Sequence, residues 1–476
     1  MKSLYAFLDK KSIYYLLLSA NLVSALIGFY LGLKAVFNDA TGYWNMGKSF
    51  GHGTFSSWYF LPVSAPETLR TWGYPFFIFL CQQIYDSFFT VQIIQLLFYG
   101  FSIYLILRLI KHFNPALIYR NVFLLFLAFN VKIPFYAGQI NAEMLCVFFI
   151  VLYAYIYYVQ KEGILKSILL AICGFCLFQL RPAFLLFPFF FFVYKLIFRR
   201  DNLKFHALSS LLYLVLLLPF GFWNYSNHGV FKITPLEGGG GVIHIGYWCP
   251  KLPEGYKENF YWGNVCVADY TQPSFTSDEE RQKNAALFEN EWLEINKKLE
   301  PFFSDEDKKR IALMQENNPG QFVLYSGAYT NEREKLLMEK TVEHVKEDFW
   351  FYTKTRIYTF CRLWFTGINK EEWNGATGIS AKVKVLFPFL SSFVFTFLGL
   401  LLSAASLALG IIKWKDFHFL FLLTIYYGLI HTPFAFQARF TVPVHLLILM
   451  MSGFVVVNII RKKYTGEREN GNEIVL

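Results

Sequence analysis

The sequence predicts an all-α polytopic membrane protein, a bundle of about ten transmembrane helices with external juxtamembrane helices and one large external loop. Of its 476 residues, 55% are hydrophobic and only 16% are charged, whereas about a quarter of the residues in a soluble domain are charged. Aromatic residues make up 20% of the chain. Long uncharged runs alternate with small clusters of Lys and Arg, which is the pattern that orients membrane proteins.

The formal net charge of +10 raises the alternative of a nucleic-acid partner. Such a partner would need a basic face on a soluble fold. Here the basic residues lie between apolar runs, so we expect no nucleic-acid partner, and membrane lipids are the expected surroundings.

The expected crossings follow from the length of each apolar run. About 20 apolar helical residues span a bilayer. Six uncharged runs approach or exceed that length, at 12–33, 88–107, 207–225, 385–412, 417–438 and 440–460. Four weaker segments lie at 121–136, 142–159, 167–180 and 182–194. The first run is longer than a signal-peptide core and lacks a small-x-small cleavage site, so we expect a retained anchor.

The segments 167–180 and 182–194 are short and meet at Arg181-Pro182. When they are counted as two crossings, the basic clusters on both sides of them fall on the same face of the membrane, as the positive-inside rule requires. The run 73–84 is too short to cross and is expected to lie in the outer interface. We therefore expect the chain to lie in the cytoplasmic (inner) membrane with both termini cytoplasmic.

Three regions follow from this topology. Residues 1–225 form an N-terminal transmembrane region with a first external loop at 34–72. Residues 226–383 form the large external loop with its Gly-rich segment, and the patterns of 278–310 and 331–364 predict amphipathic helices within it. Residues 384–476 form the C-terminal transmembrane helices and a cytoplasmic tail.

Five charged residues are expected at the outer ends of the spans: Asp39, Arg70, Glu143, Arg181 and Arg439. Charges at a membrane boundary are functional candidates because they are costly to bury. Two carboxylates and three guanidinium groups at one depth suit acid/base chemistry beside a lipid phosphate. The structural alternatives are that the acids open helices and that the arginines reach to the headgroups.

Other polar features are less specific. His52, His244 and His431 lack the close spacing of a metal site, so ordinary hydrogen bonding is expected. Cys249 and Cys266 share the external loop, where a disulfide is left open. The tetraglycine at 238–241 either lets the backbone approach a ligand closely or forms a flexible turn.

Several short motifs occur in one order along the chain. They are Asn-Asp-Ala-x-x-Tyr at 38–43, Arg-x-x-Gly-Tyr-Pro-x-Phe at 70–77, Ala-Glu at 142–143, Leu-Arg-Pro at 180–182, Glu-Gly-Gly-Gly-Gly-Val-Ile-His at 237–244 and Ala-Arg-Phe-x-x-Pro at 438–443. Together they resemble the GT-C membrane glycosyltransferases. The most similar branch is the dolichyl-phosphate-mannose protein mannosyltransferase-like and aminoarabinose transferase-like group.

The resemblance implies an extracytoplasmic active site that transfers a sugar from a polyprenyl-phosphate donor to a glycolipid, glycan or protein acceptor. It implies that Asp39 and Glu143 are catalytic and that Arg70 meets the donor phosphate. The chemistry of displacing a phosphate from a sugar needs a base and positive charge on the leaving group, which suits Asp39 as the base and Arg181 and Arg439 as further ligands of the donor phosphate. The implied substrate contacts are Tyr43, Tyr74, Glu237, Gly239, Gly240, His431 and Gln437. The chain departs from many relatives because Ala40, not a second acid, follows Asp39.

No cofactor is expected to be required. A divalent Mg or Mn ion held by Asp39 and Glu143 is left open, because carboxylate oxygens suit these metals. Two other classes are also left open. An O-antigen-type polymerase would place catalytic arginines in the large loop, and a lipid-linked glycan flippase would bury charges at the midplane between repeated halves.

Overall fold

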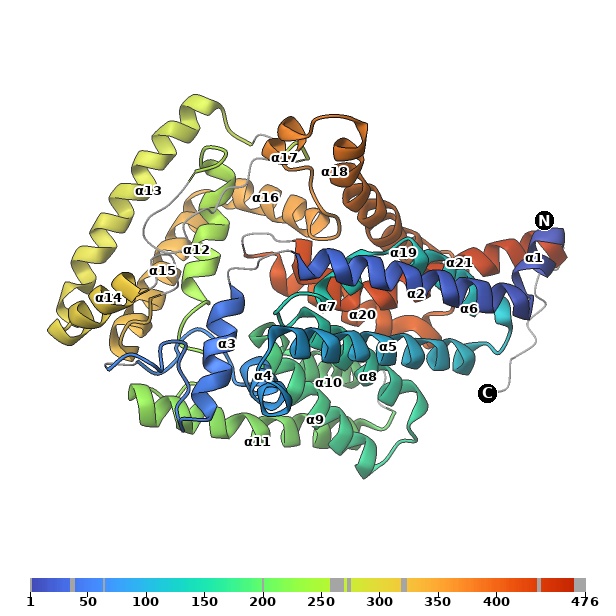
Figure 1. Ribbon diagram of the computed structural model, residues 1–476, viewed down its shortest axis with the longest axis horizontal. Helices are drawn as coiled ribbons and strands as arrows, with labels where there is room; N and C mark the ends of the chain where they lie inside the picture. The colour runs from blue at the N-terminus through green and yellow to red at the C-terminus, as the bar shows by residue number, and fades with distance from the viewer. Residues whose placement is uncertain are drawn as a thin grey trace.

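The computed structural model describes residues 2–34, 39–62, 65–198, 201–256, 269–271, 275–317, 323–434 and 438–465. Within these residues the chain is all-α, as the sequence predicts, and the only extended pairing is a single bridge between Asp269 and Asn369. Figure 1 shows an elongated molecule with a long helical bundle at one end and the helices of the large loop at the other.

Five helices are long and apolar enough to cross a membrane. They are α2 (Lys11–Leu33), α5 (Phe88–Phe113), α11 (Leu203–His228), the continuous helix Ile379–Ala408, and Arg439–Lys463. The fourth comprises α18 (Ile379–Ser392), a π-helical turn (Phe393–Leu398) and α19 (Gly399–Ala408). The fifth comprises all but the first residue of η5 (Ala438–Val444) and most of α21 (His445–Thr465). These helices indicate a multi-pass membrane protein.

Shorter apolar helices complete the bundle. They are α6 (Leu117–Ala128), α7 (Lys132–Ala137), α8 (Glu143–Val159), α9 (Ile164–Leu180), η1 (Pro182–Phe184), α10 (Phe187–Phe198) and α20 (Trp414–His431). The expected interfacial helix is α4 (Gly73–Ile84), which has the bounds that the sequence predicts and buries Tyr74, Ile78 and Cys81 on one face. It follows α3 (Asp39–Phe50), which begins at a candidate site residue.

Proline accounts for two of the differences between the predicted and the observed elements. The run 121–136 is divided between α6 and α7. Pro134 is tolerated in the first turn of α7, but in a continuous helix its ring would clash with the carbonyl of Asn130. The run 417–438 ends as a helix at His431, two residues before Pro433, because a residue preceding proline disfavours the helical conformation.

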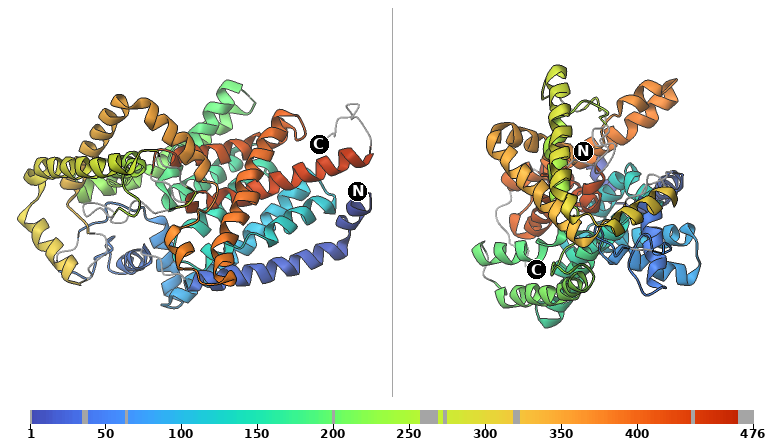
Figure 2. Two further views of the ribbon diagram at one scale, coloured as in Figure 1. Left: turned by 90° about the horizontal axis from the view of Figure 1, so that it is seen from above. Right: turned by 90° about the vertical axis from the view of Figure 1, so that its left-hand side faces the viewer.

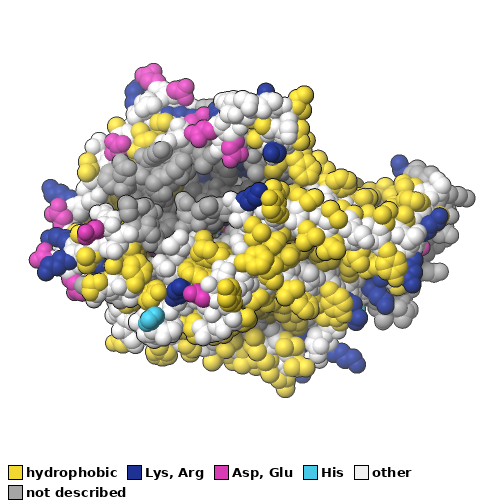
Figure 3. All heavy atoms as spheres, viewed as in Figure 1, with side chains coloured by type: hydrophobic (Ala, Val, Ile, Leu, Met, Phe, Trp, Pro, Cys, Tyr) yellow, Lys and Arg dark blue, Asp and Glu magenta, His cyan; other side chains and the backbone are white. Residues whose placement is uncertain are grey.

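The surface of the bundle is apolar. Leu16, Leu22 and Leu97 are each at least 58% exposed, and Figure 3 shows hydrophobic side chains covering the middle of the molecule between two more polar ends. An exposed apolar surface of this extent marks contact with lipid or protein. The short α1 (Lys2–Leu8) packs against α21, so the first helix and the last described helix meet at the end opposite the large loop (Figures 1 and 2).

The large loop folds into a helical lobe of its own. It contains α12 (Gly240–Trp248), α13 (Asp278–Leu299), α14 (Asp305–Asn317), α15 (Gly327–Glu347), α16 (Phe349–Arg362) and α17 (Lys370–Gly375). Trp248, Phe288, Trp292 and Leu337 are in its core. Cys266 lies outside the described residues, and with it the disulfide left open above.

Candidate functional site

A cavity of about 870 Å³ lies where the apolar bundle meets the lobe. Its charged lining comes from chain segments far apart in sequence. Asp39 begins α3, Arg70 precedes α4, Glu143 begins α8, Arg181 follows α9, and Arg439 lies in η5. The structure thus brings together all five charged residues that the sequence singled out.

Asp39 lies between two arginines. Its Oδ1 accepts a hydrogen bond from Arg70 Nη2 at 3.0 Å, and its Oδ2 is 3.6 Å from Arg439 Nη2. The Arg70 guanidinium also lies over the ring of Tyr43, 4.9 Å from its centroid. Asp39 is 22% exposed, so its carboxylate remains accessible from the cavity. Its place in the first turn of α3 also suits the helix dipole, so the structural and functional roles are compatible.

Glu143 forms the second acidic centre. It is 2% exposed, accepts a hydrogen bond from Arg181 Nη2, and lies 3.7 Å from Arg439 Nε. Arg439 therefore spans both acids, while Arg70 and Arg181 each hold one. Burial of an unpaired carboxylate would be costly, and these pairs compensate both acids.

The lining carries a small excess of positive charge. The cations are Arg70, Arg181, Lys232 and Arg439, and the carboxylates are Asp39, Glu143 and Glu237. An excess of one positive charge favours an anionic ligand, and guanidinium groups bind phosphate oxygens well. A divalent cation fits poorly, because both candidate acids are already paired with arginines and the ion would lie among three guanidinium groups.

Two charged residues beside the cavity were missed at the sequence level. Glu67 is 1% exposed and its Oε1 lies 3.8 Å from Arg70 Nη1. Burial raises the pKa of Glu67, and Arg70 partly opposes that rise. Lys232 lines the cavity, and burial lowers its pKa. The sequence could have indicated Glu67, because it lies three residues before Arg70. It could not have indicated Lys232, because a lysine after a long apolar run is usual in membrane proteins and serves to orient them.

The Gly-rich turn contributes backbone atoms and one carboxylate to the lining of the cavity. Glu237, Gly238 and Gly239 line the cavity, whereas Gly240 packs so tightly against α15 that a Cβ would clash with the carbonyl of Glu334. The Glu334 carboxylate accepts hydrogen bonds from the backbone N–H groups of Gly238 (3.1 Å) and Gly241. These contacts fix the turn, and Gly240 acts in packing.

The aromatic and histidine candidates also line the cavity. Tyr43 and Tyr74 pack edge to face at 4.8 Å, and the Tyr74 hydroxyl donates to Gln95 Oε1 at 2.9 Å. His431 donates through Nδ1 to the Tyr427 carbonyl at 2.8 Å, and its ring packs on Phe440. The hydrogen bond to Gln95 thus fixes Tyr74, and Tyr74 in turn packs against Tyr43. Gln437 lies outside the described residues.

One wall of the cavity is apolar. It includes Leu185, Leu186 and Ile430, from the link between α9 and α10 and from the end of α20. Leu186 is 53% exposed, so this wall continues to the apolar surface of the bundle. A ligand with a charged head and a hydrocarbon tail suits a cavity with these two kinds of wall.

A second cluster lies in the lobe, away from this cavity. His244 of α12, Glu291 of α13 and His344 of α15 meet there. The sequence alone predicts ordinary hydrogen bonding for His244, because Glu291 and His344 are far from it in the chain.

The fold and the cavity define a class, a multi-pass membrane protein with a charged site at one end of its helical bundle. Comparisons with protein-family models, with curated proteins and with solved structures found no match to this chain.

Proposed function

We propose that this chain is an integral membrane glycosyltransferase of the GT-C type. It transfers a sugar from a polyprenyl-phosphate donor to a glycolipid, glycan or protein acceptor on the extracytoplasmic face. In this proposal the bundle crosses the membrane about ten times, both termini are cytoplasmic, and the lobe is external.

A single observation carries the proposal. Two carboxylates and three arginines from five distant segments line one cavity at the junction of the bundle and the lobe. Structural ion pairs alone do not require the five to share a cavity, because each pair would suffice by itself to neutralise a buried charge.

The chemistry assigns a role to each group. The acceptor hydroxyl attacks the anomeric carbon of the sugar, its proton passes to Asp39, and the bond from that carbon to the phosphate oxygen breaks. The polyprenyl phosphate leaves with the electron pair, and its charge is stabilised by arginine. A single displacement of this kind inverts the anomeric centre.

The arginines could exchange the carboxylates for a donor phosphate. Arg439 lies 3.6 Å from Asp39 and 3.7 Å from Glu143, which are longer than the 2.7–2.9 Å of strong charge-assisted hydrogen bonds. A donor phosphate would gain shorter contacts to Arg439 and Arg181. Asp39 would then be released from one arginine as the donor binds, which favours its action as a base.

The rival classes receive less support. A polymerase would need catalytic arginines in the lobe, and two of the arginines there have structural partners: Arg356 donates to the carbonyls of 432–434 and of Gly246, and Arg362 pairs with Asp269. The candidate charges gather at one end of the bundle, whereas a flippase is expected to hold them near the midplane.

The test begins with the chemistry of the cell envelope. We expect a strain that lacks this chain to lose one sugar from its envelope glycolipids or glycans, as measured by mass spectrometry. Wild-type chain should restore that sugar. Asp39→Asn keeps the shape and the helix-capping ability, but removal of the base should lower transfer roughly 10²–10⁴-fold.

Asp86→Asn is the matched control. Asp86 is 55% exposed and pairs with Lys48 at 3.0 Å, away from the cavity lining, so this variant should restore the sugar fully. If Asp39→Asn protein, present in the membrane at the wild-type level, transferred sugar at the wild-type rate, Asp39 would not be the base. If deletion changed no glycan, the transferase proposal itself would fail.

A further inference from the structure

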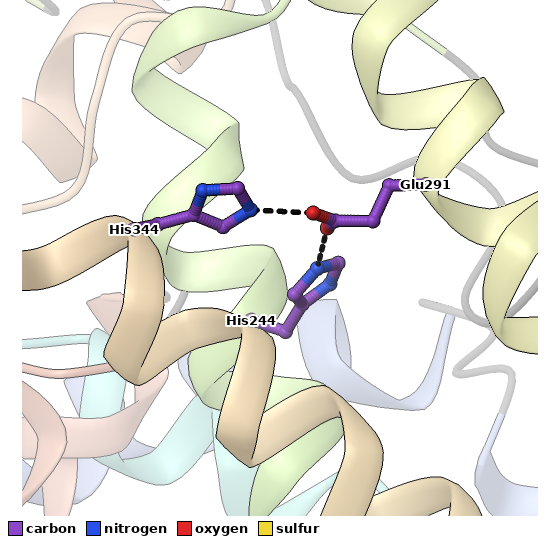
Figure 4. A group of neighbouring side chains, drawn as sticks. All are labelled: His244, Glu291 and His344. Carbon is purple, nitrogen blue, oxygen red and sulfur yellow. Dashed lines mark hydrogen bonds and ion pairs between the residues drawn. The ribbon is translucent and has the colours of Figure 1, made fainter. Parts of the chain in front are cut away.

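The cluster in the lobe joins three helices through their side chains. Glu291 accepts hydrogen bonds at its two oxygens, from His244 Nε2 at 2.6 Å and from His344 Nε2 at 2.5 Å. Figure 4 shows both imidazoles pointing at the carboxylate from different sides. The ligand atoms of the three residues all lie within 4.8 Å of one another.

The surroundings hold these side chains in place. The His344 ring stacks on Tyr247 with centroids 5.0 Å apart and planes at 7°, and the His244 ring stacks on Phe288. The Trp248 indole N–H lies 3.2 Å from Glu291 Oε1. Rings fixed by packing lose little freedom when they bind a ligand, which is how effective metal sites are built.

We propose that His244, Glu291 and His344 bind one divalent transition-metal ion, Zn²⁺ in preference to Mg²⁺ or Ca²⁺. Two imidazole nitrogens and a carboxylate oxygen are a donor set typical of Zn²⁺, whereas the hard cations prefer oxygen alone. Three protein ligands leave a fourth position for water. Bonds of about 2.0–2.2 Å require the carboxylate to turn and the rings to approach the ion.

The three side chains differ in exposure, and the most exposed one indicates the side from which an ion could enter. His244 is fully buried and Glu291 is 10% exposed, whereas His344 is 19% exposed. Glu347 lies behind His344, with Oε2 3.8 Å from Nδ1, and a carboxylate there raises the basicity of a metal-bound imidazole.

The bound ion would act as a structural tie. It would join α12, α13 and α15, and α12 follows directly from the Gly-rich turn that lines the cavity. The same turn is held to α15 by Glu334. The ion would therefore fix the turn relative to α15 without itself entering the cavity.

The test measures metal in the purified full-length chain. Tag-free protein in detergent is stripped with a chelator, incubated with ZnCl₂, passed through gel filtration and analysed for metal. We expect about one Zn²⁺ per chain and a rise in the unfolding temperature, because an ion that binds only the folded state stabilises it. MgCl₂ and CaCl₂ should give neither effect.

Two variants remove ligands and one serves as the control. Glu291→Gln and His344→Gln should lower zinc affinity by more than about 100-fold, since loss of an outer partner alone costs 10–100-fold. Glu294→Gln lies on the same helix, where Glu294 pairs with the exposed Lys298 at 2.8 Å, and should bind zinc as the wild type does.

A measurement on the wild type alone covers the case in which a variant fails to fold. Co²⁺ in a tetrahedral site of this kind should give an intense visible d–d band that Zn²⁺ abolishes. A wild-type chain that stays free of zinc, a missing cobalt band, or variants that retain as much zinc as the wild type would overturn the proposal. None of these results depends on sugar transfer.

Discussion

At the scale of single residues, the cavity shows how neighbouring charges compensate one another. Asp39 and Glu143 each have one close arginine, and Arg439 lies between them at longer distances. Together with burial, these ion pairs determine the charge state of each group. Asp39 and Glu67 outweigh the effect of burial and raise the pKa of Arg70, which therefore remains a cation throughout the working range of pH.

Arg439 lies beside both acids of the cavity, so its loss should weaken donor binding directly. We expect Arg439→Ala to reduce affinity for a short-chain prenyl phosphate by about 10- to 150-fold, because a hydrogen bond to a charged group contributes about 1.5–3 kcal/mol. This affinity can be measured from the rise in unfolding temperature that the prenyl phosphate produces in detergent. Lys48→Ala, which removes an external cation paired with Asp86, is the control. Equal affinity in both variants would give Arg439 a structural role.

At the scale of elements, a short link fixes the distance between two of the arginines. Arg70 precedes α4, and Arg181 follows α9. Between them, the Thr71 hydroxyl donates to the Gln179 carbonyl at 2.8 Å, and the backbone N–H of Trp72 donates to Gln179 Oε1 at 3.1 Å. The start of α4 is therefore bonded to the end of α9, and the cavity keeps its width.

Gly73 permits this close approach, because a Cβ there would lie 2.5 Å from the Gln179 carbonyl oxygen. We expect Gly73→Ala to push α4 away from α9 at a cost of about 1–3 kcal/mol, as overpacking usually does, and to lower transfer activity. Gly100→Ala in α5 is the control, since a Cβ there meets nothing within 4 Å. Thermal unfolding in detergent compares them, and equal stability of the two variants would refute the argument.

The sequence predicts this level of structure unevenly. Hydropathy places α2, α5 and α11 and gives both bounds of α4, although α5 and α11 extend beyond their uncharged runs because helices continue through the charged residues at their ends. It also finds Asp39 and Arg439, because a charge that lies within a few residues of such a run is conspicuous. The pairing of Arg181 with Glu143 and the meeting of His244 with Glu291 depend on helix packing between distant segments, which no local pattern encodes.

At the scale of the whole molecule, an apolar belt separates two polar ends (Figure 3). On the lobe side, α16 carries Phe349, Trp350 and Ile357 at 55%, 79% and 65% exposure. Exposed aromatic residues beside an apolar belt are typical of the membrane interface. In the proposed orientation, α16 would rest on the outer leaflet.

This orientation predicts which positions a membrane-impermeant thiol reagent can reach. In a background with the native cysteines replaced by serine, a cysteine at the exposed Asn317, at the end of α14, should be labelled in intact spheroplasts. A cysteine at Lys463, in the last turn of α21, should be labelled only after the membrane is opened. Protection at Asn317 or labelling at Lys463 in intact spheroplasts would contradict the proposed topology.

The dispersal of the cavity along the chain has a consequence for its biosynthesis. Asp39 and Arg70 leave the ribosome early, whereas Arg439 lies in η5, directly before α21. At about 5–20 residues per second, roughly 20–80 s separate the synthesis of Asp39 from that of Arg439. Once Arg181 has been synthesised, the nascent chain has both acids and two of the arginines but not yet Arg439, which lies beside both acids. Under the proposed function, the chain therefore becomes competent to act only after η5 has been synthesised, and a chain that ends before Arg439 would be inactive.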